Sequence, residues 1–417
     1  MFKGAGRPTG GCSMKVFVKG VNACVQRKME LELYKRYLRA NNHELVDSPE
    51  KSDRILLWTC GFRRDVRENS LRTIEKYKQI GPELIVCGCL PSIDPDAVSA
   101  IFKGTVFPWK KQWEAMPVLF GDAKPDLHDF KPPAIERSIG YDLDQFRKDH
   151  PGVRVTYTDQ FVKLYVSEGC NFDCAYCAEK LAFPPYRSIA VEELVEGYKG
   201  MAREVEQAGG TMPNFNKIVL WADSLGHYGS DINADLPQLI DALISIDNNI
   251  QVGLEHLHPL HFLEYFDELM EYIKKRKIFL FSIPIQSASD RILKLMNRLY
   301  TSSDVEKIFS MLNENNFTDI ETDIIAGFPS ETDAEFEKTL DFILRHKIKY
   351  TKISGYMETK GMDSAALEGK VPAEVMAGRC QKAKEAIQDA GLLCNYDADP
   401  KYQEGITRGF VELFSAT

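Results

Sequence analysis

The chain has 417 residues, of which 44% are hydrophobic and 27% charged, with 28 glycines and 20 prolines. This composition excludes a wholly disordered, collagen-like or mucin-like chain, and the length allows two or three domains. The 52 basic and 61 acidic residues give a formal charge of −9, so no general attraction to phosphate backbones is expected.

The N-terminal residues MFKGAGRPTGG contain no apolar core of a secretory signal, and no run of 18 apolar residues follows. We therefore expect a cytoplasmic protein without a membrane span. Thiols stay reduced in that compartment. Ten cysteines in such a chain indicate metal ligands or catalytic groups rather than disulfides.

The first part of the chain alternates short apolar strands with helices. Strands are predicted at 15–19 (KVFVK), 54–58 (RILLW) and 83–86 (ELIV), with a helix at about 66–77. This alternation predicts a doubly wound parallel sheet in an N-terminal α/β domain of residues 14–140.

The second part repeats the alternation six times. Its strands are predicted at 161–166, 217–221, 251–254, 278–283, 320–325 and 350–354. One helix between them opens with Thr332 and Glu335, the pattern of a capping box. Six units predict a partial (β/α)6 barrel over residues 155–371, with its chemistry at the carboxyl ends of the strands. Residues 372–417 are expected to form a last helix and a short tail.

The strongest local signal directly follows the first strand of this barrel. Residues 168–177 (EGCNFDCAYC) place Cys170, Cys174 and Cys177 in a C-x3-C-x2-C run. Iron–sulfur clusters are normally held by four cysteines, so three local ligands leave one iron open to a small molecule. The alternative is a structural zinc knot, which usually needs a second cysteine pair or a histidine nearby. No Cys or His lies between Cys177 and His227, which disfavours zinc.

Five further motifs follow in order, at residues 220–231, 258–259, 283–290, 296–298 and 323–332. With the cysteine run, they make the chain resemble the radical S-adenosylmethionine (SAM) superfamily and, within it, the methylthiotransferases. The resemblance implies a [4Fe–4S] cluster on the three cysteines. It also implies that the open iron binds S-adenosylmethionine, which is cleaved reductively to a 5′-deoxyadenosyl radical.

The same resemblance places Tyr176, Gly327 and Phe328 beside the adenine of S-adenosylmethionine. Polar residues at or beyond strand ends are plausible further partners of that cofactor. These are Asp223, Glu255, Gln286 and Arg298, with Arg187 as a candidate partner of its carboxylate. We assign no metal to His256 and His258, because a histidine beside a proline at a strand end is more often structural.

A second cysteine trio is dispersed. Cys24, Cys60 and Cys89 each lie just past a predicted parallel strand of the first domain, so they can converge at one edge of its sheet. The alternative is three unrelated buried cysteines. The repeated position favours a second iron–sulfur site, and the resemblance implies an auxiliary [4Fe–4S] cluster there. Cys87 is read as a core residue or a neighbour of that site.

The chain departs from the family where substrate is met. Methylthiotransferases that modify tRNA or a ribosomal protein carry a further C-terminal β-barrel (TRAM) domain. About 25 residues after the last helix are too few for one. We therefore expect C–S bond formation on a small molecule or peptide, with sulfur inserted with or without methyl, and RNA as an unlikely partner. An external electron donor of the flavodoxin or ferredoxin type is also expected.

Two alternatives stay open. One is methylthiolation of tRNA or a ribosomal protein, with docking by another surface. The other is a non-catalytic iron–sulfur scaffold or electron carrier, which the S-adenosylmethionine motifs disfavour.

Overall fold

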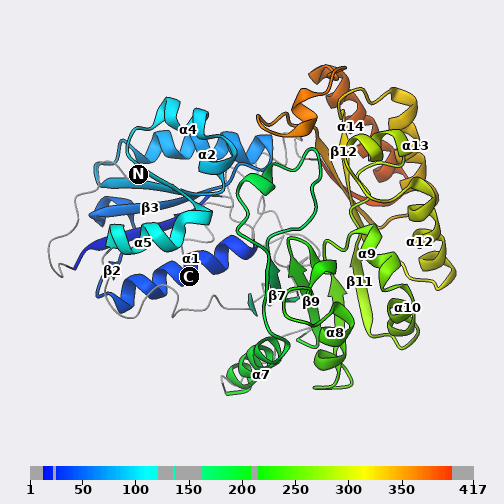
Figure 1. The fold of residues 1–417 in the computed structure, drawn as a ribbon, viewed down its shortest axis with the longest axis horizontal. Coiled ribbons are helices and arrows are strands. Elements are labelled where there is room, and N and C mark those ends of the chain that lie inside the picture. Colours follow the sequence, from blue (N-terminus) through cyan, green and yellow to red (C-terminus); the bar gives the residue numbers. More distant parts are fainter. Residues whose placement is uncertain (1–12, 22–24, 121–134, 137–160, 208–214, 397–417) are drawn as a thin grey trace.

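The computed structural model describes residues 13–21, 25–120, 135–136, 161–207 and 215–396. In these residues the chain forms two sheets, one of five strands and one of nine. Figure 1 shows the five-stranded sheet and its helices on the left and the nine-stranded sheet on the right.

The first sheet is entirely parallel, in the order β2-β1-β3-β4-β5. Its strands are β1 (Lys15–Gly20), β2 (Glu44–Leu45), β3 (Arg54–Thr59), β4 (Glu83–Gly88) and β5 (Thr105–Pro108). The elements between and after them are α1 (Val25–Ala40), η1 (Pro49–Lys51), α2 (Arg64–Tyr77), α3 (Leu90–Ile93), α4 (Pro95–Ile101), η2 (Trp109–Lys111) and α5 (Gln112–Phe120).

Helices cover both faces of this sheet. Because successive strand residues point to opposite faces, Leu56 and Ile85 pack with α1 and α5, whereas Ile55 and Val86 pack with α2 and α4. Strands buried on both faces read as continuous apolar runs, as in RILLW. The predicted doubly wound sheet is confirmed.

The second sheet has the order β14-β13-β12-β11-β10-β9-β7-β6, with β8 paired to β7. Its strands are β6 (Ile135–Glu136), β7 (Val162–Glu168), β8 (Arg187–Ser188), β9 (Lys217–Ala222), β10 (Gln251–Leu254), β11 (Ile278–Ser282), β12 (Ile320–Ala326), β13 (Tyr350–Gly355) and β14 (Leu393–Tyr396). All the predicted barrel strands are present and parallel, which confirms the partial barrel.

Helices cover one face of this sheet, in one large apolar cluster with the strand residues that point toward them. The α-helices are α7 (Val191–Gln207), α8 (Leu236–Ile244), α9 (Pro259–Glu264), α10 (Phe266–Lys274), α11 (Asp290–Leu295), α12 (Ser302–Glu314), α13 (Asp333–Arg345) and α14 (Ala373–Asp389). Short 3-10 turns are η5 (Ala178–Leu181), η6 (Leu225–His227) and η7 (Asp363–Ala366). The capping box of Thr332 and Glu335 opens α13 as the sequence predicts.

Two strands extend the second sheet beyond the predicted barrel. β6, inside the range assigned to the N-terminal domain, pairs antiparallel with β7. β14, inside the range expected to be a tail, adds a parallel strand beside β13. Each runs for only two or four residues, too short for periodicity to identify.

The two halves meet at η5, which directly follows the cysteine run. Ala178 and Ala182 belong to the same apolar cluster as Trp58, Cys87 and Cys89 of the first sheet. Lys110 Nζ also donates to the carbonyl oxygen of Leu181, at 3.1 Å. The segment after the cysteine run therefore packs on the N-terminal sheet.

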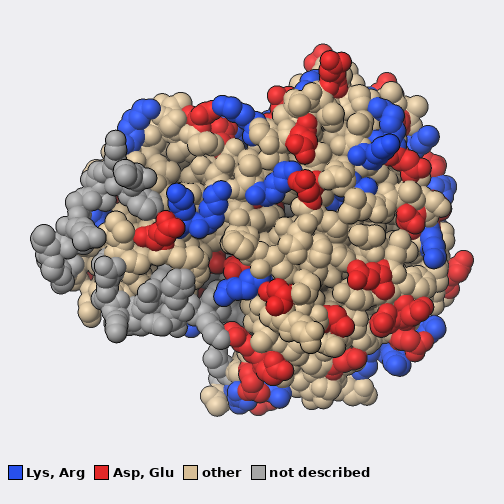
Figure 2. Space-filling model, in the orientation of Figure 1, with Lys and Arg blue, Asp and Glu red and all other residues tan. Residues whose placement is uncertain are grey.

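No helix in the described residues is both long and apolar enough to cross a bilayer. Acidic and basic side chains are intermixed over the face shown in Figure 2.

Candidate functional site

The cysteine loop leaves the carboxyl end of β7, where parallel sheets place their chemistry. Asp223 lies just past β9, and its Oδ2 accepts a hydrogen bond from the Gly169 N–H at 2.9 Å. Within the loop the Phe172 N–H donates to Cys170 Sγ at 3.4 Å. The predicted partner Asp223 is thus held against the start of the loop.

The three cysteine thiols of this loop are wholly or partly shielded from solvent. Cys174 is buried, while Cys170 and Cys177 are half-buried. Burial raises the pKa of the Cys170 thiol to about 11 and also raises that of Cys177. A bound cation would offset the cost of ionising them, since metal ligation needs thiolates.

In the described residues no three His, Cys, Asp or Glu side chains converge closely enough to hold a single metal ion. Three cysteine thiols within one loop suit an iron–sulfur cluster, which is normally held by cysteine thiolates.

The residues expected beside adenine do come together. Gly327 follows β12 with φ +77°, and a Cβ there would lie 2.7 Å from the Met376 side chain, so only glycine fits. The next residue, Phe328, is fully buried, and its ring lies edge-on to that of Tyr176 with centroids 6.5 Å apart. An apolar wall therefore stands beside the cysteine loop.

Glu331 supports this turn, a role that the sequence pattern alone does not assign to it. Its Oε2 accepts from the Gly327 N–H at 2.7 Å and from Arg379 Nη1 at 3.0 Å. Burial raises the pKa of Glu331 to about 7, although both partners oppose the shift. A glutamate four residues after a strand-end glycine was the available signal.

The remaining cofactor candidates are dispersed. Glu255 is buried just past β10, and Gln286 has φ +61° and bridges to Ile324 of β12. Arg298 lies against the cysteine loop, where its Nη1 is 3.4 Å from Cys174 Sγ. Arg187 instead pairs with Glu168 at 2.9 Å, with its side chain 59% exposed. The roles of all four stay predictions.

Charged side chains also occupy the sheet face that turns away from the helices. Lys163, Glu321 and Lys352 alternate with residues of the main apolar cluster, so they point to the opposite face. Lys352 Nζ lies 3.7 Å from Glu321 Oε2. Burial raises the pKa of Glu321 to about 7. Alternating acids in IETDIIA could have revealed this polar interior.

The histidines near the loop pack as rings. His258 stacks on Phe172 of the cysteine loop, with centroids 4.0 Å apart, and its Nδ1 accepts from the Leu260 N–H. His227 and His261 contact the same phenylalanine. Burial lowers the pKa of His258 and lowers that of His261 to about 4, so both rings are neutral near pH 7.

The second cysteine site lies at the carboxyl edge of the N-terminal sheet. Thr59 of β3 pairs with Gly88 of β4, so Cys60 and Cys89 leave neighbouring strands at the same level, and both are buried. Gly88 has φ +105°, and a Cβ there would meet the Thr59 oxygen at 2.4 Å. Cys24 lies outside the described residues, four positions beyond the end of β1.

Cys87 has a different setting from its neighbour Cys89. It is completely buried, and its Sγ donates to the Leu57 carbonyl oxygen at 3.5 Å. Burial raises its thiol pKa well above the ordinary value. These contacts support a packing role.

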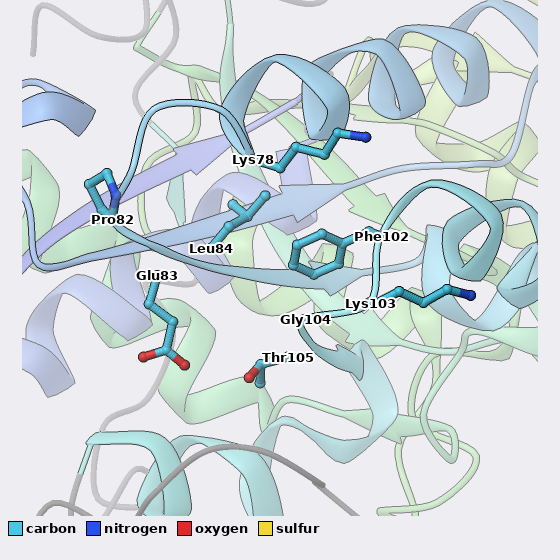
Figure 3. A pocket seen from close by; sticks show the side chains of 8 residues that line it. All are labelled: Lys78, Pro82, Glu83, Leu84, Phe102, Lys103, Gly104 and Thr105. Carbon is cyan, nitrogen blue, oxygen red and sulfur yellow. The ribbon is translucent and has the colours of Figure 1, made fainter.

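A hollow in the N-terminal domain lies away from this chemistry. Figure 3 shows its lining residues, which include Glu83 and Leu84 at the start of β4 and Thr105 at the start of β5. These are the amino ends of the strands, opposite the edge of Cys60 and Cys89, and none of the lining residues is Cys or His.

Comparison with known families matches both halves of the chain. Residues 164–343 match the Radical SAM superfamily, and residues 15–107 match the uncharacterized protein family UPF0004. A radical SAM methyltransferase from Kitasatospora setae has a similar fold, with a TM-score of 0.57, 10% identity and coverage of 85% of this chain and 74% of that one. The fold and the site therefore define a radical SAM enzyme.

Sequence similarity to known proteins extends over most of the chain. A probable threonylcarbamoyladenosine tRNA methylthiotransferase of Pyrococcus horikoshii is 26% identical over 395 residues, 93% of this chain and 86% of the relative. A ribosomal protein uS12 methylthiotransferase of Thermosipho africanus is 27% identical over 87% of this chain and 80% of its own length. The chain belongs to the radical SAM methylthiotransferase family.

This membership confirms the predicted cofactors, two [4Fe–4S] clusters and S-adenosylmethionine. The assignment of particular residues to them stays a prediction.

The expectation that RNA is an unlikely partner is wrong. Relatives named for tRNA methylthiolation match 93% of the chain in Pyrococcus horikoshii and 83% in Xenopus laevis. The expectation rested partly on net charge, which sums the whole surface, whereas docking depends on local charge. The proposed small-molecule or peptide substrate is not supported by these relatives either.

Proposed function

We propose that this protein methylthiolates tRNA at a threonylcarbamoyladenosine nucleotide. The observation that carries this proposal is the match to the Pyrococcus horikoshii relative over 93% of the chain. That match spans both cysteine sites rather than the barrel alone. Cytoplasmic location is part of the proposal, because the named relatives act on tRNA and on a ribosomal protein.

The chain's own residues divide the work between two centres. Cys170, Cys174 and Cys177 would hold the first cluster, which would supply the electron for cleaving S-adenosylmethionine. Tyr176 and Phe328 would form the wall beside its adenine. The second cluster would be held by Cys24, Cys60 and Cys89.

The reaction replaces one C–H bond of the nucleotide with a C–S bond. The hydrogen atom leaves with the 5′-deoxyadenosyl group of one S-adenosylmethionine, and a second molecule supplies the methyl group. A sulfide source supplies the sulfur. The electron consumed in cleaving the cofactor is recovered when carbon and sulfur combine, so a reductant is needed to start each cycle but not to balance it.

The contact at η5 suits this division. η5 begins one residue after Cys177, and its Ala178 shares an apolar cluster with Cys89, as does Ala182 just beyond it. This packing of the segment after the cysteine run against the segment of Cys89 supports a reaction that uses both centres.

The test uses full-length protein reconstituted with iron and sulfide, then supplied with dithionite and S-adenosylmethionine. Transcripts of one tRNA are compared with and without enzymatic threonylcarbamoylation. Nucleoside mass spectrometry should find a methylthio group in place of hydrogen only in the threonylcarbamoylated sample. Loss of the product in Cys60→Ala, with 5′-deoxyadenosine still formed, would assign it to this enzyme.

Ribosomal protein uS12 is the second candidate substrate, favoured by the Thermosipho africanus relative. It is tested in parallel. Modification of uS12 with none of the tRNA would replace the tRNA proposal.

A further inference from the structure

The motif at residues 296–298 binds three consecutive residues of the cysteine loop. The Ala175 N–H donates to the Met296 carbonyl oxygen at 3.0 Å, and Asn297 Nδ2 donates to the Asp173 carbonyl oxygen at 2.6 Å. Arg298 Nη1 then lies 3.4 Å from Cys174 Sγ. Two of these contacts hold the backbone of the loop, and the third reaches the sulfur itself.

The guanidinium of Arg298 is fixed in that position. Arg298 is 9% exposed. Its Nη2 donates to the Pro284 carbonyl oxygen at 2.9 Å, its Nε to the Tyr300 hydroxyl at 3.1 Å, and its Nη1 also to the Tyr176 hydroxyl at 3.5 Å. Its carbon Cζ lies 5.1 Å from the centroid of the Tyr300 ring. No carboxylate forms an ion pair with this guanidinium among the described residues.

A buried positive charge beside a ligand sulfur has a definite electrostatic consequence. Adding an electron makes an iron–sulfur cluster more negative, and a nearby cation stabilises the reduced form. Hydrogen bonds to the sulfurs act in the same direction, and both effects are strong away from bulk water. Of the contacts made by 296–298, only that of Arg298 carries charge to a sulfur.

We propose that Arg298 raises the reduction potential of the cluster held by Cys170, Cys174 and Cys177, through its N–H···S hydrogen bond to Cys174. It is a positioning and tuning residue that acts through the cluster ligand, and this role differs from the cofactor contact expected from the sequence. The proposal rests on the cysteine assignment in the proposed function, but it does not depend on the substrate.

The test measures the potential without turnover. A Cys60→Ala, Cys89→Ala background removes the second cluster, so that one cluster remains and iron analysis verifies its content. Arg298→Met is nearly the same length without charge or donors, Arg298→Lys keeps the charge, and Asn297→Ala removes a backbone contact only. Each is titrated with dithionite while the signal of the reduced cluster is followed by electron paramagnetic resonance.

With Arg298→Met, the ratio of reduced to oxidised cluster at a fixed solution potential should fall at least tenfold, a midpoint lower by about 59 mV for one electron. In Arg298→Lys this ratio should fall less, and in Asn297→Ala it should equal that of the parent protein. An unchanged midpoint in Arg298→Met overturns the proposal. So does an equal fall in Asn297→Ala, which would attribute the effect to loop packing.

A separate measurement of S-adenosylmethionine binding tests the role expected from the sequence, in which Arg298 contacts that cofactor. Weaker binding of S-adenosylmethionine by Arg298→Met with an unchanged midpoint would make Arg298 a cofactor anchor and overturn the tuning role. The midpoint potential and S-adenosylmethionine binding are both measured without tRNA, so they test this proposal even if every substrate assay fails.

Discussion

The two cysteine sites are built in different ways. The barrel site draws its three cysteines from one segment of eight residues and is held by neighbours on several sides, including Asp223 and residues 296–298. The N-terminal site takes one cysteine from each of several strand ends, and the pairing of β3 with β4 sets Cys60 beside Cys89. Sequence spacing specifies the first site, whereas sheet topology specifies the second.

The largest expected effect separates these two sites by reaction step. Cys174→Ala should abolish 5′-deoxyadenosine formation and product together, because it removes a ligand of the cluster that binds S-adenosylmethionine. Cys60→Ala should keep cofactor cleavage and abolish only the methylthiolated product. Both quantities are measured by liquid chromatography of one reaction mixture.

Iron analysis supplies the control, because each variant should retain about four irons if each site holds one [4Fe–4S] cluster. Loss of cofactor cleavage in Cys60→Ala at full iron content of the barrel site would show that the two sites do not work independently.

Much of the fold could be predicted from local pattern. Strands buried on both faces, such as 54–58, are apolar throughout, and the capping box at Thr332 is a short-range hydrogen-bonding pattern. The sequence pattern does not identify β6 and β14, because edge strands of two or four residues carry too little periodicity. Their pairing is decided by tertiary contacts.

The candidate site was predicted less completely for a related reason. The strand-end position identifies Asp223, and the family resemblance identifies Gly327; in both cases the backbone itself brings the residue to the site. Strand-end positions do not show where a long side chain ends. Arg187 forms an ion pair with Glu168 at the surface, whereas Arg298 contacts Cys174. The buried partner Glu331 depends on the packing of α14, which a single motif does not encode.

A smaller effect tests the barrel site through its pH dependence. The folded-state pKa of Glu331 is raised to about 7, so the folded protein binds more protons than the unfolded chain between pH 4.5 and 7. Its contribution to stability is therefore full below the unfolded pKa and is lost as pH rises through 7.

Glu331→Gln cannot ionise, so it should gain stability relative to wild type between pH 5 and pH 8, by on the order of 2 kcal/mol. Thermal unfolding at the two pH values measures this difference. A constant gap between the two proteins would mean that Arg379 keeps Glu331 ionised throughout. The N-terminal variants keep Glu331, so their stability difference from wild type should be the same at both pH values.

The smallest effect sharpens the N-terminal site by comparing Cys87 with Cys89. Cys87→Ala removes one buried sulfur and its bond to Leu57, so it should cost about 1 kcal/mol of stability while the iron content stays unchanged. Cys89→Ala, two residues away at the strand end, should lower the iron content instead. Urea unfolding and iron analysis of the two purified variants make the comparison. Loss of iron in Cys87→Ala would instead place Cys87 among the ligands, and the strand-end rule that selects Cys60 and Cys89 would then fail for this sheet.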